Sequence, residues 1–197
     1  MSDFIIPNTG KKKNENIQIL EAGPNPGILY ALVDEGTHYN KYFDKTSRTL
    51  RLIFEFPLLK QLFMEGDTEL RPTVVSQEYT FILAEKSNLK KMIDGAEGRI
   101  VQPSEYKNGW NLGKYLGRTF MVNIVNKQNK KDPSIYHNNI GGISALTDSL
   151  KAKYNFNWEE VVKSNDLVSF MIDEEGECFT SEAYQKLPNY LRKKTRE

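Results

Sequence analysis

The residues best suited to form a binding site lie in one polar stretch, HYNKYFDKTSR, which begins at His38. Aromatic rings are interleaved there with cations, and this combination suits a single-stranded nucleic acid, because bases stack on rings while cations follow the phosphates. A duplex hides its base faces, so the stretch favours single strands. The candidate DNA-binding residues in it are Tyr39, Lys41, Tyr42, Phe43, Lys45 and Arg48. In the alternative interpretation, Tyr39 and Phe43 only pack against the end of the fold.

A second basic cluster occupies the stretch NKQNKKDPSIYH, which begins at Asn126. It adds a further set of cations and rings to the candidate DNA-binding residues, namely Lys127, Lys130, Lys131, Tyr136 and His137. A lysine-rich hairpin tip is more often only a solvated turn. The functional interpretation therefore depends on this cluster lying on the same side of the molecule as the first one.

Arg51 is the last candidate, on the outward face of a predicted strand. In that position it would lie on the floor of a groove flanked by the two clusters. The alternative is a structural ion pair with Glu55 or Glu78.

The sequence carries no recognisable catalytic signature. It has no GxxxxGK phosphate-binding loop and no GxSxG element around a nucleophilic serine. The single cysteine, Cys178, and the two histidines, His38 and His137, form no metal-ligand pattern. We therefore predict a protein that is not an enzyme and has neither a metal nor a cofactor.

Hydrophobic patterning indicates which elements position these residues. Strands are expected at 27–36, 49–56, 74–83, 119–126 and 135–145. The second strand alternates cleanly, with Leu50, Leu52, Phe54 and Phe56 on one face and Arg51, Ile53 and Glu55 on the other. We expect Pro57 to end it.

A helix is expected after the third strand. Ser87 is a suitable N-cap, and Leu89, Met92 and Ile93 form an apolar stripe at helical spacing. The pair Gly141-Gly142 is expected to form a bulge or a sharp bend in the fifth strand. Three strands, a helix and two strands is the order of the OB-fold, a five-stranded barrel that often binds oligonucleotides.

The chain is expected to contain three segments. Residues 1–25 form a flexible basic arm, residues 26–150 form the mainly β OB-fold domain, and residues 151–197 form a helical and acidic C-terminal tail. In the tail, Ser181 is a suitable helix cap and Pro188 breaks or kinks a helix. The tail either packs on the barrel or docks a partner.

Composition limits the possible classes of protein. The 197 residues carry a net charge of only +1, and neither the first 150 residues nor the rest is basic overall. Local clusters must therefore provide any phosphate binding. Apolar runs fall far short of the roughly 20 residues that a membrane-spanning helix needs, and the N-terminus lacks the pattern of a secretory signal. We expect a cytoplasmic protein.

Several motifs between residues 27 and 145 resemble those of the bacteriophage OB-fold single-stranded DNA-binding proteins. The matching motifs are Asp34–Thr37, Phe54–Pro57, Ser76–Thr80, Lys86–Lys91 and Tyr115–Gly117, and the stretch AYQKLPNYLRKK is similar to the end of such proteins. The resemblance implies a protein that binds and protects single-stranded DNA, without strong sequence preference, during phage replication or recombination in an infected bacterium.

Two other interpretations stay open at this point. The near-neutral charge favours a protein-interaction module, in which an OB-like barrel or the tail docks a phage or host replication or recombination protein. A small nuclease would need several separated carboxylates that converge in space, and the sequence alone does not exclude it.

Overall fold

The computed structural model describes residues 19–41, 44–63, 67–129, 132, 136–173 and 177–196. Its strands are β1 (Gly23–Asn40), β2 (Lys45–Gln61), β3 (Arg71–Thr80), β4 (Thr119–Gln128), β5 (Tyr136–Ala145) and β6 (Val168–Phe170). Its α-helices are α1 (Asn88–Glu97), α2 (Asp148–Lys153), α3 (Glu182–Gln185) and α4 (Asn189–Lys194). The predicted order of three strands, a helix and two strands is confirmed.

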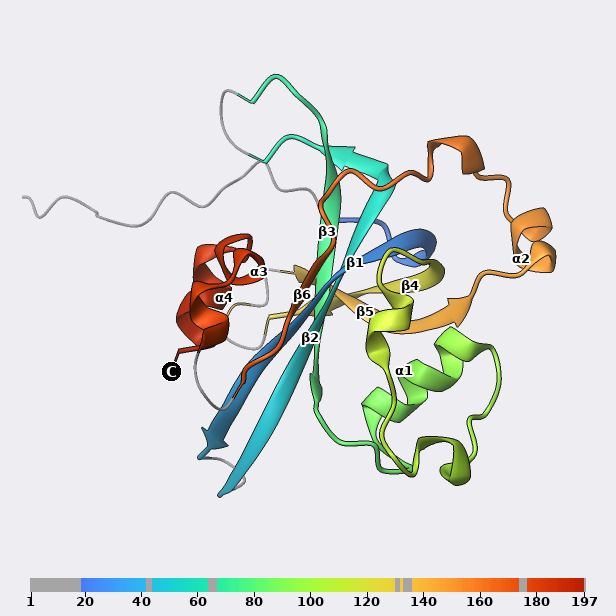
Figure 1. Ribbon diagram of the computed structural model, residues 1–197. Coiled ribbons are helices and arrows are strands. Elements are labelled where there is room, and N and C mark those ends of the chain that lie inside the picture. Colours follow the sequence, from blue (N-terminus) through green and yellow to red (C-terminus); the bar gives the residue numbers. More distant parts are fainter. Residues whose placement is uncertain are drawn as a thin grey trace, which may run out of the picture.

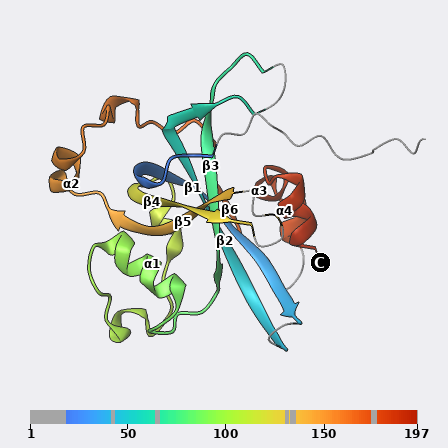
Figure 2. The same cartoon turned by 180° about the vertical axis from the view of Figure 1, so that it is seen from behind.

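The strands form one mainly antiparallel sheet in the order β3-β2-β1-β4-β5 (Figures 1 and 2). β1 joins its two halves, because residues 23–28 pair with β4 whereas residues 28–40 pair with β2. β6 is the exception to the antiparallel pattern, since it lies parallel to β1 at Ala31–Val33. The protein is therefore a β-rich fold with few and short helices.

The two faces of β2 carry different side chains, as its alternation predicts. Leu50, Leu52, Phe54 and Phe56 are buried in a core that α1 closes with Leu89, Met92 and Ile93. Ile53 faces the other way, into a second buried cluster beneath the C-terminal segment. Figure 1 shows α1 on one side of the sheet and the α3–α4 pair on the other.

Strand β2 continues to Gln61, so the prediction that Pro57 ends it is wrong. The pairing of β2 with β3 shifts register between Phe56 and Lys60, and Pro57 lies in this irregular stretch. A proline lacks a backbone N–H, and a register shift is a place where that donor is not needed. The bulge predicted at Gly141-Gly142 is confirmed by the register shift opposite Asn123 and Ile124.

Helix α1 begins where its sequence indicates. The Ser87 hydroxyl accepts a hydrogen bond from the Lys90 backbone N–H at 3.1 Å, which satisfies one of the free donors of the first turn. Gly98 ends the helix in a left-handed conformation at φ 67°. The side chain of Lys90 is buried and paired with Asp94 at 2.6 Å.

The C-terminal segment is part of the fold, and the helix cap predicted at Ser181 is confirmed. Beside the β6 pairing, Phe170, Tyr184, Leu187 and Leu191 pack with the second cluster on the sheet.

The expected arm of residues 1–25 overlaps β1, which starts at Gly23, and residues 1–18 lie outside the described part. No helix among the described residues is long and apolar enough to cross a membrane.

Gly95 is the position where α1 approaches β5 most closely. A Cβ there would lie 2.2 Å from the Ile143 carbonyl oxygen. We expect Gly95→Ala to lower the free energy of unfolding by about 1–3 kcal/mol through overpacking, although alanine is the better helix former. Urea unfolding followed by circular dichroism measures the change.

Gly142→Ala is the matched control, because a Cβ at Gly142 would meet no atom within 4 Å. Its effect should stay within about 0.5 kcal/mol. Equal stability of the Gly95→Ala protein and the wild type would contradict the tight contact between α1 and β5.

Candidate nucleic-acid interface

The β1–β2 hairpin ends in an exposed ring with neighbouring lysines. The side chain of Tyr39 is 64% exposed, and its hydroxyl donates a 2.6 Å hydrogen bond to Asp44 Oδ1. This hydrogen bond raises the pKa of Tyr39 above its ordinary value. Lys41 and Lys45 are exposed beside it, while Tyr42 and Phe43 lie outside the described residues. The hairpin extends well beyond the rest of the sheet (Figures 1 and 2), so its end is open to a ligand.

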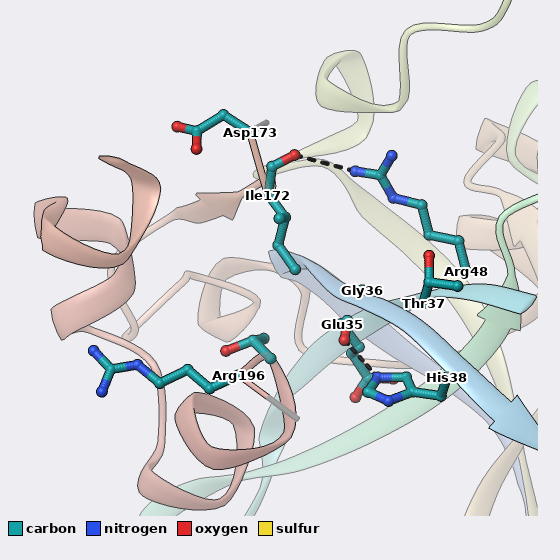
Figure 3. Close-up of a pocket in the computed structure, with 9 residues that line it drawn as sticks. Glu35, Gly36, Thr37, His38, Arg48, Ile172, Asp173 and Arg196 are labelled. Atoms are coloured by element: carbon teal, nitrogen blue, oxygen red, sulfur yellow. Dashed lines mark hydrogen bonds between the residues drawn. The ribbon is translucent and has the colours of Figure 1, made fainter. Parts of the chain in front are cut away.

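Arg48, nearer the base of this hairpin, has a structural role. Its guanidinium forms an ion pair with the buried carboxylate of Asp34 and donates a 3.2 Å hydrogen bond to the Ile172 carbonyl. Figure 3 shows Arg48 turned toward that carbonyl. The same guanidinium lies 5.4 Å from the centre of the Phe81 ring. Arg48 therefore ties both strands of the hairpin to the segment that follows β6.

The environment of Asp34 stabilises its charged form. Burial alone would raise its pKa, but hydrogen bonds from Arg48 and from the backbone N–H groups of Gly36 and Ile172 outweigh this effect. The pKa of Asp34 is consequently below its ordinary value. The carboxylate is thus negatively charged at neutral pH and compensates the charge of Arg48.

Arg51 lies in a cluster of charges beneath α4. Its guanidinium contacts Glu35 Oε1 at 2.6 Å and Glu78 Oε2 at 3.0 Å. Lys194 of α4 reaches the same two carboxylates, with 2.8 Å between its Nζ and Glu35 Oε2. Of the two roles that the sequence left open for Arg51, the structure shows the ion pair, with Glu78 and with Glu35 rather than Glu55.

Glu55 is instead the anchor of the C-terminal segment. Its buried carboxylate accepts hydrogen bonds from the backbone N–H groups of Ser164 at 2.9 Å and Asn165 at 3.0 Å. The outer face of β2 is therefore partly covered near Arg51, whose guanidinium is paired with two carboxylates.

The β4–β5 hairpin carries the second exposed set. Tyr136 is 46% exposed, Lys127 is exposed, and the His137 ring lies 3.0 Å from the Asn129 amide nitrogen. Lys130 and Lys131 lie outside the described residues. The register pairs Lys127 with His137 and Gln128 with Tyr136, so Tyr136 and Lys127 lie on opposite faces of this hairpin. The two hairpin tips lie toward opposite ends of β1, because β4 pairs with residues 23–28 and β2 pairs with residues up to Asn40.

A groove that sequence analysis missed lies where β3 and β5 approach each other. It has a volume of about 460 Å³ and is lined by Gln77, Tyr79, Asn88, Lys91, Met92, Val125, Lys127, Ile140, Gly141, Gly142 and Ile143. None of these described residues is acidic, and two of them are exposed lysines. Lys127 and the Gly141-Gly142 bulge are evident in the sequence, but no local pattern connects them with each other or with the residues of α1.

Comparison with known proteins adds no relative. The chain matches no protein-family model, and no curated protein matches it. The described residues also contain no group of three or more His, Cys, Asp or Glu side chains that could hold a metal ion. The functional argument therefore rests on the arrangement of the hairpins and the groove.

The Asp34–Arg48 pair predicts a pH-dependent contribution to stability. Because the pKa of Asp34 is lowered on folding, its contribution is present above the unfolded value of about 3.9 and disappears as the pH falls through the folded value. We expect Asp34→Asn to cost about 1.5–3 kcal/mol at pH 7, as for a hydrogen bond to a charged group, and less near pH 3, where the carboxyl of the unfolded chain is largely protonated. Urea unfolding at both pH values measures the difference.

Asp148→Asn is the control for this experiment. Asp148 is fully exposed, and its Oδ1 lies 3.9 Å from Lys151 Nζ. Because exposed ion pairs contribute little to stability, its replacement should leave the stability nearly unchanged at both pH values. A loss in the Asp34→Asn protein that is equally large at pH 3 and pH 7 would show that the pair contributes through packing rather than charge.

Proposed function

We propose that this chain is a non-enzymatic OB-fold protein that binds single-stranded DNA, with little sequence preference, in phage replication or recombination. Support for the fold comes from the sheet order β3-β2-β1-β4-β5 and from α1, which lies between β3 and β4 in sequence and packs against β5. In this proposal β3 and β5 close a partly open barrel. The motifs that resemble the phage proteins supply the biological setting.

The observation that carries the proposal is the pair of hairpin tips. Tyr39 and Tyr136, from different hairpins of one sheet, are both exposed, and each hairpin also carries exposed lysines. An exposed ring next to a cation offers a face to one base and a charge to the adjoining phosphate. Such sites ignore base identity, because every base has a flat face, and they discriminate against duplexes, whose bases are already stacked.

The ion pairs of β2 limit which residues can contact DNA. Arg48 and Arg51 are held by carboxylates, so they supply little attraction for phosphate. We therefore assign DNA contact to Tyr39, Lys41 and Lys45 on one hairpin and to Lys127, Tyr136 and His137 on the other.

A protein-interaction module was the alternative, with the C-terminal tail as docking element. Several apolar side chains of that tail, including Phe170, Leu187 and Leu191, are buried against the sheet of the same chain, although Val162 and Met171 stay exposed. The buried side chains are not available to a partner, and the exposed rings and lysines of the hairpins make DNA binding the better-supported function.

Fluorescence anisotropy provides the direct test. A labelled single strand of about 30 nucleotides should bind much more tightly than its duplex, and log K should fall with log salt by about 0.7 for each phosphate neutralised. The label should stay intact after incubation with magnesium or manganese, as expected for a protein that is not a nuclease. Equal binding of single strand and duplex would contradict a stacking site.

Replacing the exposed tyrosines tests the site itself. We expect Tyr39→Ala and Tyr136→Ala each to weaken binding roughly 5- to 150-fold, which corresponds to the loss of about 1–3 kcal/mol for one stacked base. Tyr39→Phe keeps the ring and should retain most of the affinity, because only the hydrogen bond to Asp44 is lost.

Tyr190→Ala on α4 is the matched control, since that ring is 59% exposed but lies on neither hairpin. The affinity of this variant should equal that of the wild type, with thermal unfolding used to confirm that all variants are folded. If the Tyr190 variant loses as much affinity as the hairpin variants, the binding surface lies elsewhere.

A further inference from the structure

The groove lies between β3 and β5, the two terminal strands of the sheet. These two strands occupy opposite ends of the sheet order and lie close together, yet no ladder joins them in the described part of the chain. Helix α1 fills one side of the gap through its contacts with both strands. The register shift opposite Asn123 and Ile124 adds an irregularity to β5 at the groove wall. What remains open is a cleft large enough for a small organic group.

The two lysines of this groove differ in their ion pairing from five other cations that the structure describes. Arg48, Arg51, Lys90, Arg99 and Lys194 all pair with carboxylates. Lys91 from α1 and Lys127 from β4 line one groove, and neither pairs with an acidic side chain among the residues that the structure describes. Two lysines directed at one cleft without a counter-charge favour an anionic ligand.

The other residues that line the groove suit the base of a nucleotide, as the two lysines suit its phosphate. Met92, Ile140 and Ile143 give the groove an apolar wall, against which the flat face of a base can lie. Asn88 and Gln77 bring carboxamides, which can both donate to and accept from a base edge. The Gln77 amide nitrogen already donates to the Glu78 carbonyl at 3.1 Å, so this carboxamide is held in one orientation.

Tyr79 adds a polar atom to this lining. Burial raises its pKa to about 12, so its hydroxyl keeps its proton at neutral pH and can act as a hydrogen-bond donor.

We propose that this groove holds one unstacked nucleotide of a bound single strand, with a phosphate near Lys91 and Lys127 and the base against the apolar wall beside Asn88. The inference rests on the proposed function and extends it. Lys127 is paired with His137 at the start of the β4–β5 hairpin tip, so the groove borders the face of this hairpin that carries His137, whereas Tyr136 lies on the opposite face. A strand that contacts His137 would reach the groove within a few nucleotides.

The phosphate part of this proposal is tested with charge variants. The double variant Lys91→Gln with Lys127→Gln should bind a single strand of about 30 nucleotides roughly tenfold more weakly and with a salt slope smaller by about one. Replacing both lysines with arginine should restore affinity and slope. Lys107→Gln is the control, because Lys107 is exposed and does not line the groove.

The base part is tested with an abasic oligonucleotide, which keeps the phosphates and lacks the bases. Asn88→Ala should weaken binding of the normal strand several-fold and leave binding of the abasic strand unchanged. Ser87 rather than Asn88 caps α1, so the helix should stay intact, which circular dichroism can verify.

The outcomes separate the two proposals. Wild-type affinity and slope in the double lysine variant, with tyrosine variants that still lose binding, would overturn the groove site and leave single-strand binding standing. An Asn88→Ala protein that weakens both strands equally would overturn the placement of a base there. Absence of any preference for single strands in the wild type would overturn the function itself.

Discussion

Two adjacent carboxylates of β1 impose the main constraint on this fold. Asp34 and Glu35 are both buried, and a buried charge is tolerated only when it is paired and hydrogen-bonded. The β2 strand supplies Arg48 to the first and Arg51 to the second. The C-terminal segment adds two further partners, the Ile172 backbone N–H for Asp34 and the Lys194 ammonium for Glu35. The sheet and the C-terminal segment therefore neutralise these charges together.

This constraint determines where a ligand can bind. The cations at the base of the β1–β2 hairpin serve the buried acids, and the helices that complete this network cover the adjoining sheet face. Lys91 and Lys127 line the groove between β3 and β5, and neither has a carboxylate partner in the part of the chain that the structure describes. The same electrostatic requirement that holds the C-terminal segment in place thus moves the candidate interface to the hairpin tips and the groove.

Local sequence patterns predicted those features that depend on neighbouring residues. They include the order of the strands, the cap at Ser87 and the irregularity at Gly141. The partner of Arg51 depended on pairing between strands instead. Glu55 shares a face with Arg51 but lies four residues along the strand, about 13 Å away, whereas a residue directly opposite lies about 5 Å away. Glu78 is that opposite residue, and its identity required the register. The groove could not be predicted either, because four segments that are distant in the sequence form it, namely β3, α1, β4 and β5.

The near-neutral charge of the chain agrees with an interface of this kind. With a net charge of +1, long-range attraction to DNA is weak, and binding has to come from short-range contacts. Exposed rings supply such contacts, since stacking on a base depends little on ionic strength compared with phosphate binding. A few exposed lysines on the same hairpins would then be sufficient to hold the backbone of the strand. Under the proposed function, selectivity for single strands comes from stacking, and the modest charge limits non-specific attachment to duplex DNA.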